Sequence, residues 1–168
     1  MPHAPALSPA RRDMPSDNFF PEFSTAAALK HAHSGRLEPW LYTYLETGAW
    51  ANPGLAQGLQ QQPRWWLGPL ELPLAQLQRA CGPEPEMEYR VSPASWEKRV
   101  TRIAASLREP LAVAPLIVEY RAGHLSVRDG NHRYGAMQRV GWTRAWVIIW
   151  HNSPADFEAS RRMLDAEV

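Results

Sequence analysis

Apolar residues recur at helical spacing in the first part of the chain, where glycines and prolines divide the pattern into short segments. Three helices are predicted there, each with a capping residue or proline at its start and a glycine or proline at its end: Ser24 to Gly35, Pro39 to Gly48, and Asn52 to Pro63. Together they predict an all-helical extension over residues 21–63. Residues 1–20 are rich in proline, alanine and polar residues without periodicity, which is typical of a disordered leader.

From Arg64 onward, short apolar runs alternate with helical segments. The clearest helix starts at Ser92–Pro93, carries a buried stripe at three- and four-residue spacing, and ends before Pro110. Further helices are predicted from Asn131 to Val140 and after Ser153–Pro154. Extended segments are predicted for the runs WWLGPLELPL, APLIVEY, HLSVRD and RAWVIIW. This order of elements predicts a compact mixed α/β domain over residues 64–168.

The composition narrows the classes of protein that fit. The net charge is +1 and the pI is about 8.0, so no overall basic field is available to hold DNA, which would need a local patch. The single cysteine, Cys81, excludes a disulfide within one chain and argues against a cysteine zinc site. No apolar run has the length of a signal-peptide core or a membrane span. We therefore expect a cytoplasmic protein without a membrane partner.

The stretch VRDGNHRYGAMQRVGW places versatile side chains where a predicted strand meets a predicted helix. The first N–H groups of a helix lack partners and bind phosphate readily. Gly130 lets the backbone approach a ligand, Arg133 can hold phosphate oxygens in a two-point fork, and His132 can add a donor. Asp129 can accept a hydroxyl proton or bind Mg²⁺. A plain turn followed by a solvated helical turn explains the same residues, so these residues alone leave both interpretations open.

The longer stretch PLIVEYRAGHLSVRDGNHRYGAMQRVGWTRAWVIIW resembles the core of the ParB/sulfiredoxin superfamily. Its members share an apolar strand that starts with proline, a hairpin, a Gly-x-x-Arg box that opens a helix, a glycine stop and a final strand. The box here is Gly130, Asn131, His132 and Arg133. The resemblance covers residues 64–151, is strongest over 115–150, and leaves out the helical extension. It implies a small mixed sheet with flanking helices and a nucleotide phosphate bound at the box.

The branches of this superfamily differ in their chemistry. Sulfiredoxins carry a catalytic cysteine where this chain has Asn131, so that activity is not expected, and Cys81 lies in the wrong segment to replace it. ParB partition proteins bind CTP and add a DNA-binding domain and a dimerisation tail, for which the stretch after Trp150 is too short. Free-serine kinases carry Asp-Gly-His-His-Arg, which DGNHR matches except at Asn131. Some plasmid-borne single-domain relatives are similar to ATPases and nucleases, so nuclease activity stays an alternative interpretation.

The kinase branch also implies a catalytic glutamate in the loop after the first strand. The corresponding loop is GPEPEMEYRV, in which Glu86 is the first candidate and Glu84 and Glu88 follow it. Arg90 of the same loop is a candidate contact to the nucleotide. A solvated acidic turn explains this loop equally well.

The pattern and the resemblance together predict a nucleotide-phosphate-binding protein that holds ATP, ADP or CTP at Gly130–Arg133 with Mg²⁺ at Asp129. The favoured reaction is phosphoryl transfer to an unidentified small-molecule acceptor or nucleotide hydrolysis, with Glu86, Asp129 and His132 as catalytic residues. Two alternatives stay open: a nuclease, and a nucleotide-gated module that binds DNA or a protein without turnover. A homodimer also stays open.

Overall fold

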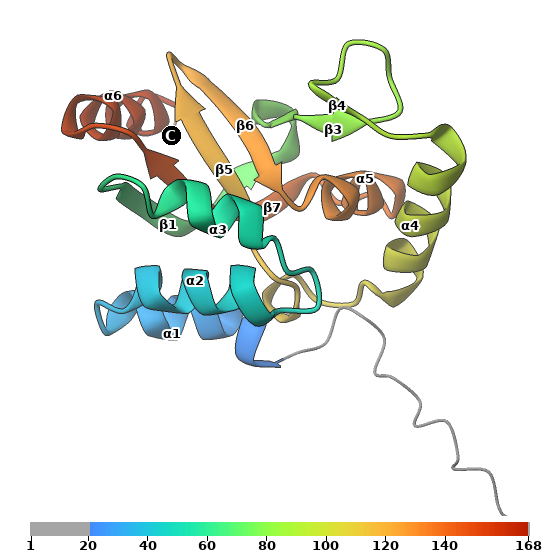
Figure 1. Ribbon diagram of the computed structural model, residues 1–168, viewed down its shortest axis with the longest axis horizontal. Coiled ribbons are helices and arrows are strands. Elements are labelled where there is room, and N and C mark those ends of the chain that lie inside the picture. The colour runs from blue at the N-terminus through green and yellow to red at the C-terminus, as the bar shows by residue number, and fades with distance from the viewer. Residues whose placement is uncertain (1–20, 168) are drawn as a thin grey trace, which may run out of the picture.

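The computed structural model describes residues 21–167, in which helices lie on both faces of a central mixed sheet (Figure 1). The strands, in sheet order, are β1 (Trp65–Pro73), β7 (Arg144–His151), β5 (Leu116–Arg121), β6 (His124–Asp129) and β2 (Gln78–Arg79). β1 pairs with β7 and β5 with β6 in antiparallel fashion, whereas β5 pairs with β7 and β2 with β6 in parallel fashion. The predicted mixed α/β class is therefore confirmed.

The predicted extension contains three α-helices, with small differences at their ends. They are α1 (Thr25–His33), α2 (Leu37–Thr47) and α3 (Pro53–Leu59), preceded by the 3₁₀ helix η1 (Pro21–Phe23). The Ser24 hydroxyl caps α1 by accepting the N–H of Ala27. α2 starts ahead of Pro39, and α3 ends well before Pro63. The predicted leader, residues 1–20, lies outside the described residues.

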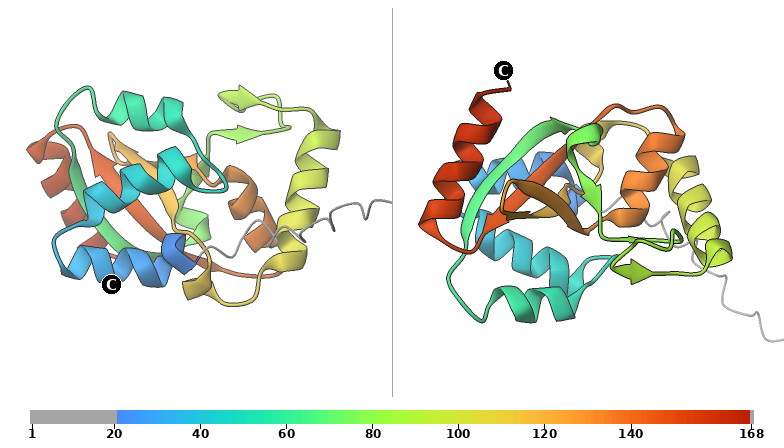
Figure 2. Two further views of the ribbon diagram at one scale, coloured as in Figure 1. Left: turned by 60° about the horizontal axis from the view of Figure 1, so that its bottom comes forward. Right: turned by 90° about the horizontal axis from the view of Figure 1, so that it is seen from above.

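These three helices pack together on one face of the sheet (Figure 2). Because successive strand residues point to opposite faces, β5 and β7 each supply side chains to both layers. Ile117, Ile148 and Trp150 join the core under α1–α3. Leu116 and Val147 belong to the core on the opposite face. The extension therefore shares a buried core with the sheet.

The opposite face is covered by the remaining helices: α4 (Pro93–Ser106), α5 (Asn131–Arg139) and α6 (Pro154–Asp165). α4 packs against α5. The predicted stripe comprises Trp96, Val100, Ile103, Ala104 and Leu107, and all of these are buried except Ala104, which is partly buried. Gly135 permits this packing, because a Cβ there would lie 2.8 Å from the Trp96 ring. The short elements are η2 (Leu74–Gln76), β3 (Cys81–Gly82), β4 (Tyr89–Arg90) and η3 (Pro110–Ala112).

Candidate phosphate-binding site

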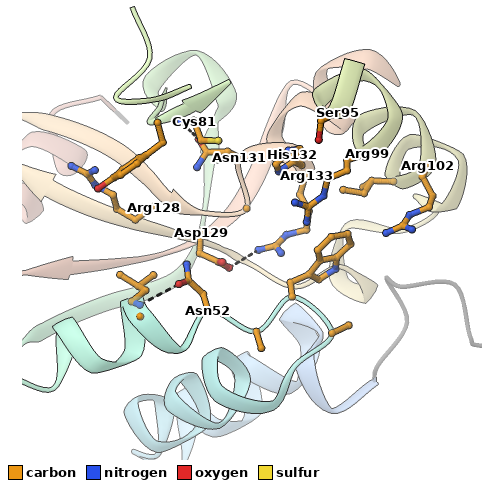
Figure 3. A pocket seen from close by; sticks show the side chains of 18 of the residues that line it. Asn52, Cys81, Ser95, Arg99, Arg102, Arg128, Asp129, Asn131, His132 and Arg133 are labelled. Carbon is orange, nitrogen blue, oxygen red and sulfur yellow. Dashed lines mark hydrogen bonds and ion pairs between the residues drawn. The ribbon is translucent and has the colours of Figure 1, made fainter. Parts of the chain in front are cut away.

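A pocket of about 1210 Å³ lies at the N-terminal end of α5 (Figure 3). Its walls come from α4, from the start of α3 and the segment before it, and from the junction of β6 with α5. All five residues from Asp129 to Arg133 line it. Ligand pockets in proteins typically measure about 300–1,000 Å³, so this one has room for a nucleotide.

Among the charged side chains that line this pocket, cations outnumber anions. Lys98, Arg99 and Arg102 of α4 line it together with Arg128 of β6. Asp129 is the only carboxylate among the described residues of the lining. Within residues 21–167, no ion pair involves Lys98 or Arg99. The balance of charge therefore favours an anionic ligand.

The backbone at the start of α5 adds further donors. Gly130 is the N-cap residue, with a φ of 99° in the left-handed region, and as a glycine it contributes no side-chain cap to the helix. The N–H of Tyr134 donates to the Gly130 carbonyl at 2.8 Å and is the first hydrogen bond of the helix. The N–H groups of Asn131 to Arg133 therefore have no acceptor within the helix. These groups carry the positive end of the helix dipole and suit a phosphate.

Arg133, the arginine of the box, is held by a buried network. Its Nη2 donates to the carbonyl oxygen of Pro115 at 3.1 Å and to Oδ2 of Asp129 at 3.2 Å. The hydroxyl of Tyr44 donates to the same Oδ2 at 2.9 Å. Burial raises the pKa of Tyr44 far above its usual range, so this hydroxyl stays a donor. The carboxylate of Asp129 thus orients Arg133 and links it to α2.

The side chains of the pocket do not form a metal site by themselves. Mg²⁺ in nucleotide sites is usually bound through one or two carboxylates and substrate phosphates. The carboxylate of Asp129 already accepts hydrogen bonds from Tyr44 and Arg133. No group of three or more His, Cys, Asp or Glu side chains that could hold a metal occurs in the part of the chain that the structure describes. A Mg²⁺ ion in this pocket would therefore need the phosphates of a nucleotide as further ligands, with Asp129 as the one carboxylate that the described lining could contribute.

His132 lies half-buried between the pocket and α4. Its ring centroid is 4.7 Å from that of Trp96, and the Arg79 guanidinium lies 4.7 Å from the Trp96 centroid. Burial, together with the positive charges of Arg99 and Arg133, lowers the pKa of His132 to about 4. At neutral pH, His132 is therefore a neutral imidazole that can donate one hydrogen bond and accept one.

We expect acid to destabilise the protein partly through His132. Its pKa falls from 6.5 to about 4 on folding, so between these values the unfolded chain binds more protons and stability falls as the pH falls. His132→Asn should flatten the decline in unfolding free energy from pH 7 to pH 4.5, measured by urea unfolding. The exposed His124 provides the matched control, and equal pH slopes for His132→Asn and His124→Asn would contradict the prediction.

Asn131 fixes the box to the neighbouring chain segment. Its Oδ1 accepts the N–H groups of Ala80 at 2.9 Å and Cys81 at 3.2 Å, and its Nδ2 donates to the Val127 carbonyl at 3.0 Å. The side chain of Asn131 is thus hydrogen-bonded within the protein, and Asn131 can donate to a ligand through its backbone N–H. Cys81 is brought beside the pocket, where burial raises the pKa of its thiol and keeps it protonated.

The loop GPEPEMEYRV, called the acidic loop below, forms ion pairs with two arginines. Glu84 pairs with Arg79, and Glu88 pairs with Nη1 of Arg128 at 2.7 Å. Glu86 is exposed and does not line the pocket. Arg90 is also exposed and lies outside the pocket lining. The structure therefore brings Asp129 to Arg133 together at the pocket and leaves Glu86 and Arg90 outside it.

Sequence reasoning missed the polar face of α4 and the segment between α2 and α3. Ser95, Arg99 and Arg102 project from α4 into the pocket at three- and four-residue spacing (Figure 3). This spacing, one residue ahead of each member of the apolar stripe, is the signal that could have found them. Trp50 also lines the pocket, with the guanidinium of Arg99 5.0 Å from its ring centroid. No sequence pattern marks Trp50.

No protein-family model matches this chain, and no curated protein matches its sequence. Among solved structures, it is similar to sulfiredoxin from Arabidopsis thaliana, with 26% identity, a TM-score of 0.39, and coverage of 56% of this chain and 94% of that chain. It is also similar to C-terminally truncated chromosome-partitioning protein ParB from Caulobacter crescentus complexed to the centromeric parS site, with 21% identity, a TM-score of 0.36, and coverage of 52% of this chain and 41% of that chain.

A second ParB structure from Caulobacter crescentus, complexed with CTP-gamma-S, is 18% identical, with a TM-score of 0.39 and coverage of 64% of this chain and 54% of that chain. The chain thus spans about half the length of the two ParB structures. These neighbours come from the superfamily that the motif resembles.

No helix within residues 21–167 combines the length and the apolar character needed to cross a membrane.

Proposed function

We propose that the pocket binds the phosphate groups of a nucleotide, ATP, ADP or CTP, at Gly130–Arg133. The observation that carries this proposal is the charge of the pocket. Cations line it, and its single described carboxylate, Asp129, is neutralised by Arg133 and hydrogen-bonded by Tyr44. A phosphate at the start of α5 would meet the free N–H groups of the helix and face the cations of α4.

A phosphate chain suits this arrangement better than a single phosphate. The N-terminus of α5 offers one anchoring point, and Lys98 and Arg99 on α4 offer others across the same pocket. Arg99 projects from α4 in the direction of Arg133 (Figure 3). Both Arg99 and Arg133 lower the pKa of His132, so their positive charges act on the same region. A di- or triphosphate would neutralise this concentration of charge.

For the reaction, we propose nucleotide hydrolysis or phosphoryl transfer to a small-molecule acceptor. Catalysis of phosphoryl transfer rests on positioning, electrostatic stabilisation and a group that orients the attacking hydroxyl or water. His132 lines the pocket and is neutral at pH 7, so it can accept the proton. Glu86 stays the base that the kinase resemblance implies.

One observation favours a second candidate, a nucleotide-gated module that binds without turnover. The described lining holds no carboxylate besides Asp129, which is engaged with Tyr44 and Arg133. Turnover of the bound nucleotide separates the two candidates: release of inorganic phosphate, or transfer of phosphate to an acceptor, supports the enzyme, and binding without either supports the module.

Thermal unfolding with ATP, ADP, CTP and GTP, each with and without Mg²⁺, tests the binding proposal. A nucleotide at one hundred times its Kd should stabilise the folded state by about 2.7 kcal/mol and raise Tm accordingly. Arg99→Gln should weaken binding of that nucleotide by about ten- to a hundredfold, since a hydrogen bond to a charged group contributes about 1.5–3 kcal/mol.

The matched control is Arg162→Gln on α6, which removes the same charge from an exposed position outside the pocket lining. We expect this control to leave the nucleotide Kd unchanged. The proposal fails if none of the four nucleotides raises Tm. It also fails if Arg99→Gln and Arg162→Gln change the Kd equally, because binding would then follow net charge alone.

A further inference from the structure

We propose that Tyr44 of the helical extension is a positioning residue of the phosphate site. Its hydroxyl fixes Asp129, and Asp129 in turn holds the guanidinium of Arg133 at the start of α5. This inference rests on the proposed function, because it explains how the arginine of the box is kept in place for a phosphate.

The three side chains form one buried unit. Tyr44 is 1% exposed, Arg133 3% and Asp129 7%. The hydroxyl of Tyr44 and Nη2 of Arg133 both donate to Oδ2 of Asp129, at 2.9 and 3.2 Å. The guanidinium carbon also lies 6.0 Å from the centroid of the Tyr44 ring. A carboxylate with two donors on one oxygen has little freedom to rotate.

The ring of Tyr44 is itself fixed. It stacks on Trp40 with centroids 5.6 Å apart and an interplanar angle of 4°, and the edge of Phe23 packs on it at 5.7 Å. Both neighbours belong to the extension. The hydroxyl is therefore presented to Asp129 by a rigid aromatic cluster, which locks the rotamer of the carboxylate more firmly than Arg133 alone would.

Arg133 keeps donor capacity that the fold leaves unused. Nη2 is engaged with Pro115 and Asp129, but the buried Nε has no hydrogen-bond partner among the described residues. A buried donor without a partner costs about 1–3 kcal/mol, so a native structure that retains one needs a reason. A phosphate drawn to the start of α5 is the reason that the cationic pocket suggests.

The extension is therefore part of the site. In residues 21–167, the side-chain hydrogen bonds to Asp129 come from Tyr44 of α2 and from Arg133 of the box. The next segment of the extension supplies Trp50 and Asn52 to the wall of the same pocket. The helices that cover the sheet thus also set the geometry of the box.

Tyr44→Phe in the full-length chain tests this role, because it removes the hydroxyl and keeps the ring. The matched control is Tyr42→Phe on the same helix, whose hydroxyl donates to Glu38 at 3.3 Å on the surface. Titration calorimetry with ATP and with CTP should show about tenfold weaker binding for Tyr44→Phe and an unchanged Kd for Tyr42→Phe. Both Kd values are measured well below the Tm of every variant.

A double-mutant cycle separates positioning from a general loss of structure. In an Arg133→Lys background, Tyr44→Phe should change the Kd less than twofold, because its effect passes through the guanidinium. If Arg133→Lys does not fold, the Nε–H resonance of Arg133 in arginine-labelled protein gives the second readout. This resonance should shift in Tyr44→Phe without ligand and stay in place in Tyr42→Phe.

The failure of this inference differs from failure of the proposed function. If the wild-type chain binds ATP or CTP and Tyr44→Phe binds it equally well, Tyr44 is not a positioning residue, and the phosphate site stands. An equal loss of affinity in both arginine backgrounds, or an unmoved Nε–H resonance, overturns the inference as well. If neither nucleotide binds the wild-type chain, the proposed function fails, and the inference fails with it.

Discussion

Arg133→Ala is expected to lower the free energy of unfolding by about 3–5 kcal/mol and to abolish phosphate binding. Asp129 is only 7% exposed in the structure. The change removes the cationic partner of its carboxylate and leaves the Tyr44 hydroxyl as its remaining side-chain donor within residues 21–167. An unpaired buried charge costs far more than a lost surface contact. Urea unfolding followed by tryptophan fluorescence at pH 7.5 measures the loss, and the same preparation is titrated with nucleotide.

Two comparisons make this result specific. Arg139→Ala breaks the exposed pair with Glu97, so it should cost about 0–1 kcal/mol. The double variant Asp129→Asn with Arg133→Met replaces the buried charges by neutral groups of similar size, and should recover much of the stability without recovering binding. A cost for Arg133→Ala no larger than that for Arg139→Ala would show that the buried pair does not hold this part of the fold.

The order of elements could be predicted from the sequence because its signals are local. Ser92–Pro93 marks the start of α4, and Asp129–Gly130 marks the junction of β6 with α5. Caps, turn residues and side-chain periodicity act within a few residues, so they can be recognised in the sequence without knowledge of the tertiary structure. The box was found for the same reason.

The partners of the box could not be predicted in this way. Tyr44 and Asp129 are 85 residues apart, and their hydrogen bond depends on how α2 packs on the sheet. The direction of the α4 cations depends on the packing of α4 against α5, where Trp96 contacts Gly135. Sequence spacing shows that a face is polar, but tertiary packing decides what that face meets.

The acidic loop shows the same limit. Three glutamates spaced by two residues in the sequence have three different environments in the structure. Glu84 is partly buried and pairs with Arg79, Glu88 is exposed and pairs with Arg128, and Glu86 is exposed and forms no ion pair within residues 21–167. Both arginines come from strands at the edge of the site, and neither pairing has a local sequence signal. The choice of Glu86 as catalytic base rests on the resemblance, and it stays a prediction.

Gly130→Ala is the second change expected to have a large effect, with a loss of about 3 kcal/mol in unfolding free energy and a marked loss of phosphate affinity. Gly130 has a φ of 99°, where an L side chain costs about 1–2 kcal/mol. An added Cβ would also lie 2.6 Å from Cδ2 of Leu116 and 2.7 Å from Nη2 of Arg133. Such overpacking costs about 1–3 kcal/mol more, because neither neighbour can move freely.

Gly141→Ala separates these two contributions. Gly141 has a φ of 86° at the other end of α5, and an added Cβ would meet no atom within 4 Å. Gly141→Ala should therefore cost about 1–2 kcal/mol from backbone strain alone and leave nucleotide affinity unchanged. The difference between the two variants in unfolding free energy measures the close approach of Gly130 to Leu116 and Arg133. If Gly130→Ala and Gly141→Ala cause equal losses of unfolding free energy and equal changes in nucleotide affinity, the prediction is wrong. The backbone at Gly130 would then accommodate a Cβ and would not position Arg133.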